Sequence, residues 1–444
     1  MPSALTRILA LLRSIANRLE RNPREAAAAI FALAFAVRVF VLFAAHTWPE
    51  TYHLEVTAVA TSIARGEGFS NPFAAYPTGP TAHVAPLYPY VVAGIFSMFG
   101  PNVGDLIKQL LACIISAAIY AYVPALAVMT GFSRSVGILA GFIGALSIVS
   151  IEVEVVGKWE GHLAALLFVV AITFWLRNIR SGELSAGRAA LSGLVWGLLF
   201  LTSPSFLTVL CALCLVLAIQ YRRKKKQVFV YIATVSAVAA LVVAPWIVRN
   251  YRTFGALFWI RSNAGLEFYV SNAPGTKVTL AENVRGVFTK LHPNLSRKIG
   301  ERFADMGEVA FNRDYMARFK QTVRSDPARF LKVTVARALW MWFPVTAHPI
   351  RDNVLIRDIY SCTISVMALV GLFLLRGKLE MGTLTLITAF FAYQVLYWFV
   401  QAATRYRFPI AWVYCLLCSY ALLTLYEKWR APQRHLSSTR SSMS

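Results

Sequence analysis

The feature of this sequence that most constrains its fold is a series of long apolar runs. A run of about 18 or more apolar residues is long enough to cross the roughly 30 Å hydrocarbon core of a bilayer as a helix. The sequence therefore predicts an all-α integral membrane protein. We expect about ten spans, near residues 26–46, 103–130, 136–152, 161–177, 188–203, 205–220, 228–247, 356–375, 381–400 and 408–426.

Composition supports this class, since 57% of the residues are hydrophobic and only 15% are charged. The bilayer then replaces much of a soluble core, so the usual domain lengths do not apply. We divide the chain into an amino-terminal transmembrane unit (1–247), a region outside the membrane (248–355), carboxy-terminal transmembrane helices (356–427) and a basic tail (428–444).

Basic residues predict the topology of these spans. They collect in the amino-terminal segment, in residues 177–188, in the run 222–226 and in the tail, which all lie on one face of the predicted arrangement. The positive-inside rule makes this face, and both termini, cytoplasmic. The net charge of +23 is spread over short loops, so it indicates contact with membrane lipids rather than with nucleic acid.

Three segments then lie on the outer face, at 47–102, 153–160 and 248–355. The first is rich in Pro, Gly and aromatic residues, which predicts an ordered loop against the membrane. Within it, the apolar stretch 85–99 is too short to cross comfortably, and we expect an interfacial helix or a re-entrant hairpin. The third segment contains two helical stretches, 305–319 and 330–343, the second of which we place in the interface.

Several common chemistries have no support in the sequence. The CxxC pairs Cys211/Cys214 and Cys415/Cys418 lie inside apolar helices, so they are interpreted as helix-packing residues rather than as metal or redox sites. The sequence has no Walker loop, no GxGxxG after a strand, no HExxH and no GxSxG. Nucleotide-driven transport is therefore not indicated.

Charged residues at the outer ends of spans are the candidate functional groups. Arg405 and Arg407 lie between two apolar runs on the face where basic residues should be scarce, so they are candidates to hold an anion. Glu152, Glu154 and Glu160 lie where two spans meet, and carboxylates near hydrocarbon are often functional. The alternatives are arginines that extend to lipid headgroups and acids that are solvated span ends.

The chain contains a series of short motifs in a fixed order: an acid before GxGF (66–69), the stretch PTAxxAPLYP (80–89), WEG (159–161), PWxxRNY (245–251), DPxRFL (326–331) and RYRxPI (405–410). Their order resembles that of the membrane-embedded GT-C glycosyltransferases. It is most similar to bacterial relatives of dolichyl-phosphate-mannose protein mannosyltransferases and of the lipid A aminoarabinose transferase. The resemblance covers roughly residues 30–426.

This resemblance implies a GT-C-like bundle that moves a sugar, with inversion, from a polyprenyl-phosphate carrier such as undecaprenyl phosphate. The acceptor would be a lipid, a glycan or a protein on the periplasmic face of the bacterial inner membrane. The resemblance assigns the catalytic carboxylate to Glu55 and the second-loop acid to Glu160. Many relatives carry Asp-Glu where this chain has Tyr52 and His53, so Glu50 remains an alternative to Glu55.

The chemistry of such a transfer needs a carboxylate and a group of cations. A phosphate leaves as a weakly basic anion, and Arg405, Arg407 and Arg249 at span ends are expected to bind it. A carboxylate on the other side of the sugar would orient or deprotonate the acceptor. The residues expected to line the substrate are Tyr52, His53, His83, Tyr88, Asn250 and Tyr406.

The sequence identifies no cofactor. Some relatives use a divalent ion, and His53 and His83 could join Glu55 as its ligands, with loop hydrogen bonding as the alternative. For Tyr52 and Tyr88, the alternative to stacking on a sugar is a place in the interfacial aromatic belt.

Two other functions stay open: a transporter or flippase of a lipid-linked glycan, and a glycan polymerase or ligase. The sugar, the acceptor and the oligomeric state are not encoded by any residue pattern.

Overall fold

The computed structural model describes residues 14–49, 54–73, 76–156, 160–182, 184–345, 352–377 and 379–441. Within these ranges the regular structure is helical, and pairing of extended backbone is limited to two isolated bridges, Ser70 with Pro80 and Thr279 with Ala402. The predicted all-α class is confirmed.

Among the described residues, seven helices are long and apolar enough to cross a membrane. The other three predicted spans are present as helices of fewer than 18 residues, namely α5 (Arg134–Ala145), α8 (Ala186–Thr202) and α9 (Leu207–Gln220). The seven long helices are α2 (Pro23–Ala44), α4 (Leu87–Met129), α7 (Gly161–Arg180), α10 (Lys225–Phe254), α17 (Asp352–Leu374), α18 (Met381–Phe399) and α20 (Ala411–Ser441).

The predicted continuous span 136–152 was wrong. Helix α5 ends at Ala145, and a separate short helix, α6 (Ile148–Ile151), leads into a π-helical turn at Glu152–Val156. Ser147 begins α6, because its hydroxyl accepts a hydrogen bond from the Ser150 amide at 3.3 Å. A serine that satisfies a free amide at a helix start competes with continuation of the preceding helix.

Helix α4 joins the predicted short apolar stretch 85–99 to the following span across a kink. Gly100 has φ 73° and ψ 165°, which is outside the helical region, and Pro101 follows it. Glycine adopts a positive φ without steric cost, and proline lacks the amide that a continuous helix would need. The sequence therefore sets a change of direction at this point, although its depth in a membrane stays a prediction.

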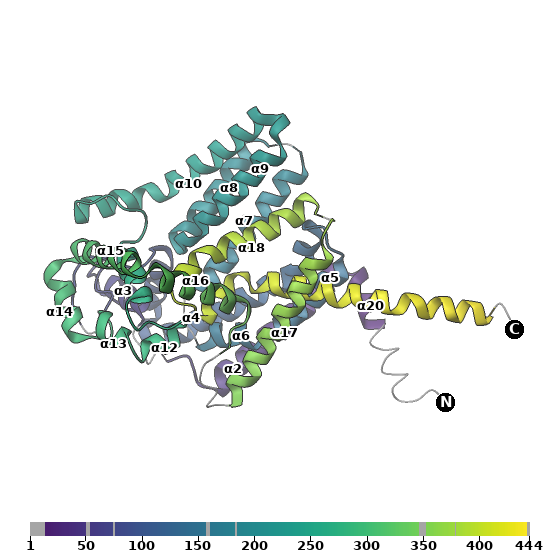
Figure 1. Cartoon of the computed structure of the whole chain (residues 1–444), viewed down its shortest axis with the longest axis horizontal. Helices are drawn as coiled ribbons and strands as arrows, with labels where there is room; N and C mark the ends of the chain where they lie inside the picture. The colour runs from purple at the N-terminus through teal and green to yellow at the C-terminus, as the bar shows by residue number, and fades with distance from the viewer. Residues whose placement is uncertain are drawn as a thin grey trace.

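Figure 1 shows α3, α12, α13, α14 and α15 gathered at one end of the bundle, opposite the far end of α20, with α16 between this end and the long helices. We call this end the loop side, made of the described parts of 45–86, 255–345 and 400–407. The predicted helices at 305–319 and 330–343 are both confirmed, as α15 and α16. The helices of the loop side are α3 (Glu55–Ala64), α11 (Ala264–Asn272), α12 (Leu280–Val284), α13 (Phe288–Leu291), α14 (Arg297–Met306), α15 (Glu308–Ser325), α16 (Pro327–Trp342) and α19 (Thr404–Arg407).

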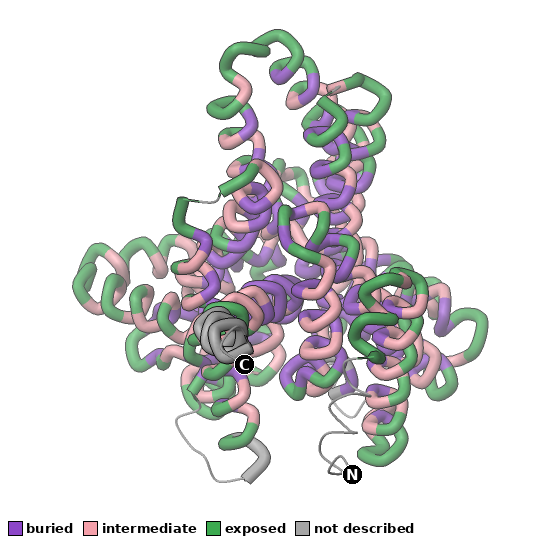
Figure 2. Tube along the Cα trace, turned by 90° about the vertical axis from the view of Figure 1, so that its right-hand side faces the viewer, coloured by how far each residue is buried: buried purple, intermediate pink, exposed green. Residues whose placement is uncertain are grey.

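Two hydrophobic clusters explain how the loop side is held on the bundle. The large cluster includes residues from all the long helices, and its Trp175, Trp196 and Trp412 are fully buried. Figure 2 shows buried positions concentrated where the helices cross in the middle of the bundle. A separate cluster lies on the loop side and contains Phe73, Leu266, Val270, Phe288, Phe303, Phe311 and Tyr315. Because Phe73 belongs to the first loop and the others to residues 264–315, this second core fixes the first loop against the later region.

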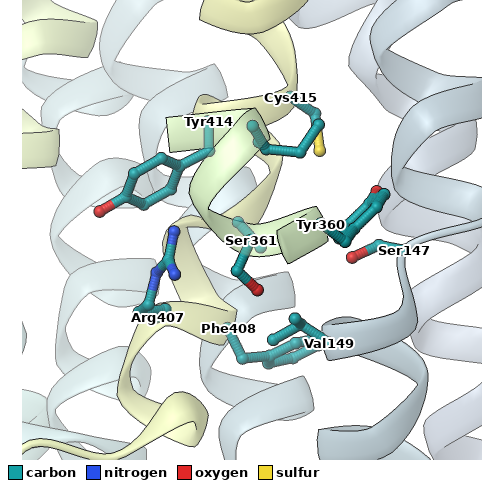
Figure 3. Close-up of a pocket in the computed structure, with 10 residues that line it drawn as sticks. Ser147, Val149, Tyr360, Ser361, Arg407, Phe408, Tyr414 and Cys415 are labelled. Atoms are coloured by element: carbon teal, nitrogen blue, oxygen red, sulfur yellow. The ribbon is translucent and has the colours of Figure 1, made fainter. Parts of the chain in front are cut away.

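Helices α17 and α20 pack closely at one edge of the bundle. A Cβ atom on Gly371 would lie 2.3 Å from the Leu417 carbonyl oxygen, so the glycine permits this approach. Towards the loop side the two helices frame a small cavity (Figure 3).

Candidate functional site

Glu55, the predicted catalytic acid, is the first residue of α3 and is half-buried on the loop side. Its Oε1 accepts a long hydrogen bond, 3.4 Å, from Nδ2 of Asn294. Burial raises the pKa of the Glu55 carboxyl above its usual value, while the charges of Arg405 and Arg261 act in the opposite direction. The residue is therefore a more basic carboxylate than an exposed glutamate, and two cations lie near enough to influence it.

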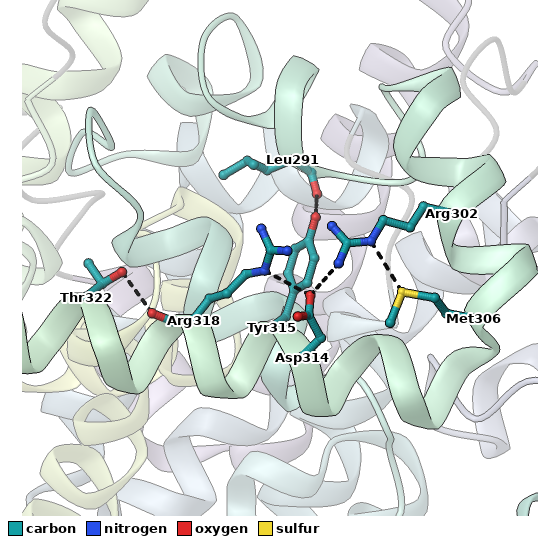
Figure 4. Close-up of polar contacts among 7 residues, drawn as sticks. All are labelled: Leu291, Arg302, Met306, Asp314, Tyr315, Arg318 and Thr322. Carbon is teal, nitrogen blue, oxygen red and sulfur yellow. Dashed lines mark hydrogen bonds and ion pairs between the residues drawn. The ribbon is translucent and has the colours of Figure 1, made fainter.

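Asn294 reaches Glu55 because the segment after α13 is anchored on both sides. The ring of His292 stacks on Phe288 at 4.9 Å, and its Nδ1 accepts a hydrogen bond from the Asn294 amide at 3.2 Å. Burial lowers the pKa of His292 to about 4, so the ring is neutral at pH 7 and can act as this acceptor. On the other side, the Tyr315 hydroxyl donates to the Leu291 carbonyl at 3.0 Å (Figure 4).

Helix α15 is itself fixed by the ion pairs drawn in Figure 4. Asp314 Oδ2 contacts Arg302 and Arg318, each at 2.9 Å, and thereby joins α14 to α15. Both arginines are partly exposed, so the pairs contribute little to stability alone. Their effect is to orient the helix that carries Tyr315.

Arg405 lies within electrostatic range of both predicted acids. Its guanidinium lies 5.2 Å from the centre of the Tyr406 ring and donates to the Tyr406 hydroxyl at 3.4 Å. The charges of both Glu160 and Glu55 act on it. Glu160 is only 6% exposed, at the start of α7, so a nearby cation is what its charge requires.

Aromatic side chains form one wall beside Arg405. Tyr406 stacks on Tyr397 with ring centres 4.5 Å apart, and the Tyr397 hydroxyl donates to Ser205 at 3.1 Å. Tyr88, a predicted sugar-stacking residue, is 3% exposed and makes an edge contact with His162 at 5.2 Å. Tyr88 therefore supports the start of α7 in this structure, and its contact with substrate stays a prediction.

Arg249 and Asn250 are engaged by backbone carbonyl groups. Arg249 donates to the carbonyl oxygens of Thr81 at 2.6 Å and of Phe69 at 3.0 Å, both in the first loop. Its guanidinium also lies 4.8 Å from the Trp246 ring. Asn250 is fully buried and donates to the Ile260 carbonyl at 3.3 Å. These contacts give both residues a role in holding loops, while direct contact with a donor phosphate stays a prediction.

Glu308 is a buried acid that no motif in the sequence indicated. Its carboxylate accepts hydrogen bonds from the Thr81 hydroxyl at 2.5 Å, from the Ala82 amide at 2.7 Å and from the Ser262 hydroxyl. Burial raises its pKa, and Arg249 is among the groups that oppose this shift. We call Glu308 and Arg249 the loop latch, because together they connect Phe69, Thr81 and Ala82 of the first loop to α10 and α15.

His83 lies behind the site rather than open to it. It is 2% exposed, its ring makes an edge contact with Phe73 at 5.0 Å, and burial lowers its pKa well below the usual range. Its carbonyl accepts a hydrogen bond from Arg261 Nε at 2.9 Å, which positions Arg261 near Glu55. Arg261 is a second cation of the site, and no motif in the sequence indicated it.

The suggested metal ligands cannot be assembled from the described residues. Tyr52, His53 and the alternative acid Glu50 lie outside the described ranges. Within those ranges, no group of three or more His, Cys, Asp or Glu side chains is arranged to hold a metal ion. The metal site stays a prediction.

Arg407 does not share the surroundings of Arg405. The two residues lie on one helical turn, α19, and at 100° per residue their side chains point about 200° apart. Arg407 donates to Ser365 of α17 at 2.8 Å and lies 4.6 Å from the Tyr414 ring, beside the cavity of Figure 3. The expected arginine pair therefore does not face one anion in this structure.

The geometry thus combines a basic carboxylate, a buried second acid and two cations on the loop side of a membrane bundle. These acids and cations suit a reaction in which a group is transferred and the leaving group departs as an anion. It could hold a phosphate and accept a proton within one site.

Comparison with solved structures identifies the fold. One similar structure is that of an archaeal oligosaccharyltransferase, AglB from Archaeoglobus fulgidus, in complex with an inhibitory peptide and a dolichol-phosphate. The match covers 93% of this chain and 52% of the archaeal chain, with a TM-score of 0.54 and 14% sequence identity. The chain shares its fold with an oligosaccharyltransferase. The apo form of the Archaeoglobus fulgidus enzyme gives a TM-score of 0.52 over the same shares of both chains.

These matches confirm the expected GT-C-like, all-α membrane fold. The chain spans about half the length of both solved structures, and at 14% identity the likeness concerns the fold alone. No protein-family model and no curated protein sequence matches the chain significantly.

Proposed function

We propose that this protein is an inverting glycosyltransferase that moves a sugar from a polyprenyl-phosphate donor to an acceptor on the periplasmic side of the bacterial inner membrane. The observation that carries the proposal is that Arg405 lies on the loop side within electrostatic range of both Glu55 and Glu160. The shared fold adds support, because one solved structure with it holds a dolichol-phosphate. Both chain termini would then be cytoplasmic.

In this proposal Arg405 and Arg261 bind the donor phosphate. As the bond from the sugar C1 to the phosphate oxygen breaks, its electron pair goes to the phosphate, and the negative charge on the phosphate increases. Guanidinium groups fixed before the reaction stabilise such developing charge without reorganising. Glu160 keeps Arg405 in place through their opposite charges, and the loop latch holds Phe69, Thr81 and Ala82 of the first loop.

Glu55 acts as the general base. It removes the proton from the acceptor hydroxyl or amine while that atom forms its bond to C1, on the side of the sugar opposite to the phosphate. Attack from the opposite side inverts the anomeric configuration. The raised pKa of Glu55 suits this task, because a base works best when its pKa approaches the working pH.

The site draws on three of the four predicted segments. Glu55 and Glu160 come from the segment 1–247, Arg261 and Asn294 from 248–355, and Arg405 from 356–427. We therefore propose that the region 248–355 completes the active site rather than serving as a separate unit.

The test is sugar transfer by the purified protein in detergent. Radiolabelled sugars on undecaprenyl phosphate would be supplied with lipid, glycan and peptide acceptors, and product configuration would be read by NMR. Transfer with inversion is expected. Absence of transfer with every donor, together with movement of a lipid-linked glycan across proteoliposomes containing the protein, would instead establish a flippase.

A further inference from the structure

Arg407 is a buried cation whose hydrogen bonding is incomplete. It is 6% exposed, and Nη2 donates to Ser365 Oγ at 2.8 Å. Its other terminal nitrogen, Nη1, has no hydrogen-bond partner among the described residues. Among the described residues, no carboxylate oxygen lies within 4.0 Å of an Arg407 nitrogen, which is the limit for an ion pair. A charge buried in this way calls for a partner.

A second unsatisfied donor lies at the same place. Ser361 of α17 is 4% exposed, and its hydroxyl has no partner among the described residues. Both Ser361 and Arg407 line the cavity between α17, α20 and the turn at Ser147 (Figure 3). Of the other polar groups in its wall, the Tyr360 hydroxyl donates to the Ile143 carbonyl at 3.2 Å.

The acids of this corner are already engaged. Arg357 contacts Glu152 at 3.0 Å and Asp358 at 3.1 Å. Asp358 precedes Ser361 by three residues, so it lies within one turn of the cavity, but its charge is shared with Arg357. The cavity therefore presents a positive charge and two free donor groups.

We propose that this cavity is an anion site in which Arg407 and Ser361 bind the phosphate group of a membrane lipid, separately from the donor phosphate at Arg405. The cavity volume is about 30 Å³. A single water needs roughly 10 to 15 Å³ measured in this way, so the space equals about two or three waters and admits one or two oxygens of a phosphate, but neither a whole headgroup nor a sugar ring.

The position of the cavity favours a lipid as the source of the phosphate. On its other face, α17 exposes Ile356 and Ile359, at 57% and 58%, as a lipid-facing helix does. The cavity therefore lies directly against a helix that is expected to face the bilayer, where lipid phosphates are found. The inference deepens the proposed function, since a second phosphate site on α19 would hold an acceptor lipid or the departing carrier.

The experiment is native mass spectrometry of the full chain in detergent, titrated with undecaprenyl phosphate, with undecaprenol and with inorganic phosphate. The wild type should bind two molecules of undecaprenyl phosphate and show no comparable uptake of undecaprenol. Arg407→Gln should weaken one of the two binding events about tenfold or more, the usual worth of a charge-assisted hydrogen bond. Arg376→Gln is the matched control, because it removes the same charge from the exposed far end of α17.

Ser361→Ala keeps the test informative if Arg407→Gln fails to fold. It removes only an unpartnered hydroxyl, so it should weaken the same binding event with no loss of thermal stability. Competition by inorganic phosphate at the Arg407-dependent site would show that free phosphate also enters; absence of competition would identify the lipid as the source. Unchanged binding in both Arg407→Gln and Ser361→Ala would overturn the proposal.

This result is separable from the proposed function. Arg405→Gln should lose the donor event and keep the Arg407-dependent one. If the protein transfers no sugar with any donor, Arg407-dependent phosphate binding would still establish the second site.

Discussion

Glu308 is as buried as Glu160, and its hydrogen bonds hold loops together, so we expect its replacement to lower the stability of the fold. Its carboxylate joins Thr81 and Ala82 of the first loop to Ser262. Replacing it by Ala removes three hydrogen bonds and leaves the Ala82 amide without an acceptor. Replacing it by Gln keeps the shape and one acceptor oxygen.

The two substitutions should lower the free energy of unfolding by different amounts. Loss of one partner from a buried charged network costs roughly 3 to 5 kcal/mol, so Glu308→Ala should lower the unfolding midpoint by on the order of 5 °C. Burial raises the pKa of Glu308, so the folded protein tolerates a neutral group there. Glu308→Gln should therefore cost only about 1 kcal/mol.

The assay is thermal unfolding in detergent, followed by tryptophan fluorescence. Glu301→Ala is the matched control, because Glu301 is exposed and pairs only with exposed Arg297 at 2.9 Å. Its midpoint should not move. A structural role for the Glu308 hydrogen bonds is excluded if Glu308→Ala unfolds at the same temperature as Glu301→Ala, or if Glu308→Gln is destabilised as much as Glu308→Ala.

Two further predictions concern the same side of the bundle. Gly265→Ala should lower the free energy of unfolding by about 1 to 3 kcal/mol or more, because the new Cβ atom would lie 1.9 Å from the Asn312 carbonyl oxygen. Gly94→Ala is the control, since a Cβ atom there meets nothing within 4 Å and should not destabilise the protein. Equal unfolding midpoints for the two variants in a thermal scan would contradict this prediction. The pKa of His292 falls to about 4 in the folded protein, so folding becomes less favourable as pH drops from 6.5 towards 4, by roughly 3 kcal/mol in total. A thermal scan across this pH range should show the loss reduced in His292→Gln but not in exposed His46→Gln, and an equal loss in both would exclude His292 as its source.

The sequence predicted the helices well because each long helix depends on a local property. Apolar runs identified seven long helices and three shorter ones, and the break at Ser203 and Pro204 separates α8 from α9 as the sequence indicated. The break after Ala145 was missed, since it depends on a serine cap inside an apolar run.

The candidate site was only partly predictable for a different reason. Glu55, Glu160 and Arg405 were found through motifs, whereas Asn294 contacts Glu55 across 239 residues of sequence. Glu308 reaches Thr81 across 227 residues. Contacts of this length depend on how helices pack, and no local pattern encodes them.

The arginine pair shows the same limit at short range. Arg405 and Arg407 are two residues apart, so an extended loop would direct them to one side and a helix to opposite sides. The structure has a helical turn, which separates them. Because of this helical turn, the two arginines do not face one anion together, and each has its own set of neighbours.

In the proposed mechanism Glu55 performs the chemistry while Arg405 holds the donor. Donor binding and single-turnover sugar transfer, compared in Glu55→Gln and Arg405→Gln, separate these two roles. Glu55→Gln should bind undecaprenyl-phosphate sugar with near wild-type affinity and transfer it at least about 100-fold more slowly, as expected for loss of a general base. Arg405→Gln should lose binding as well. Wild-type transfer rates in Glu55→Gln would exclude Glu55 as the general base.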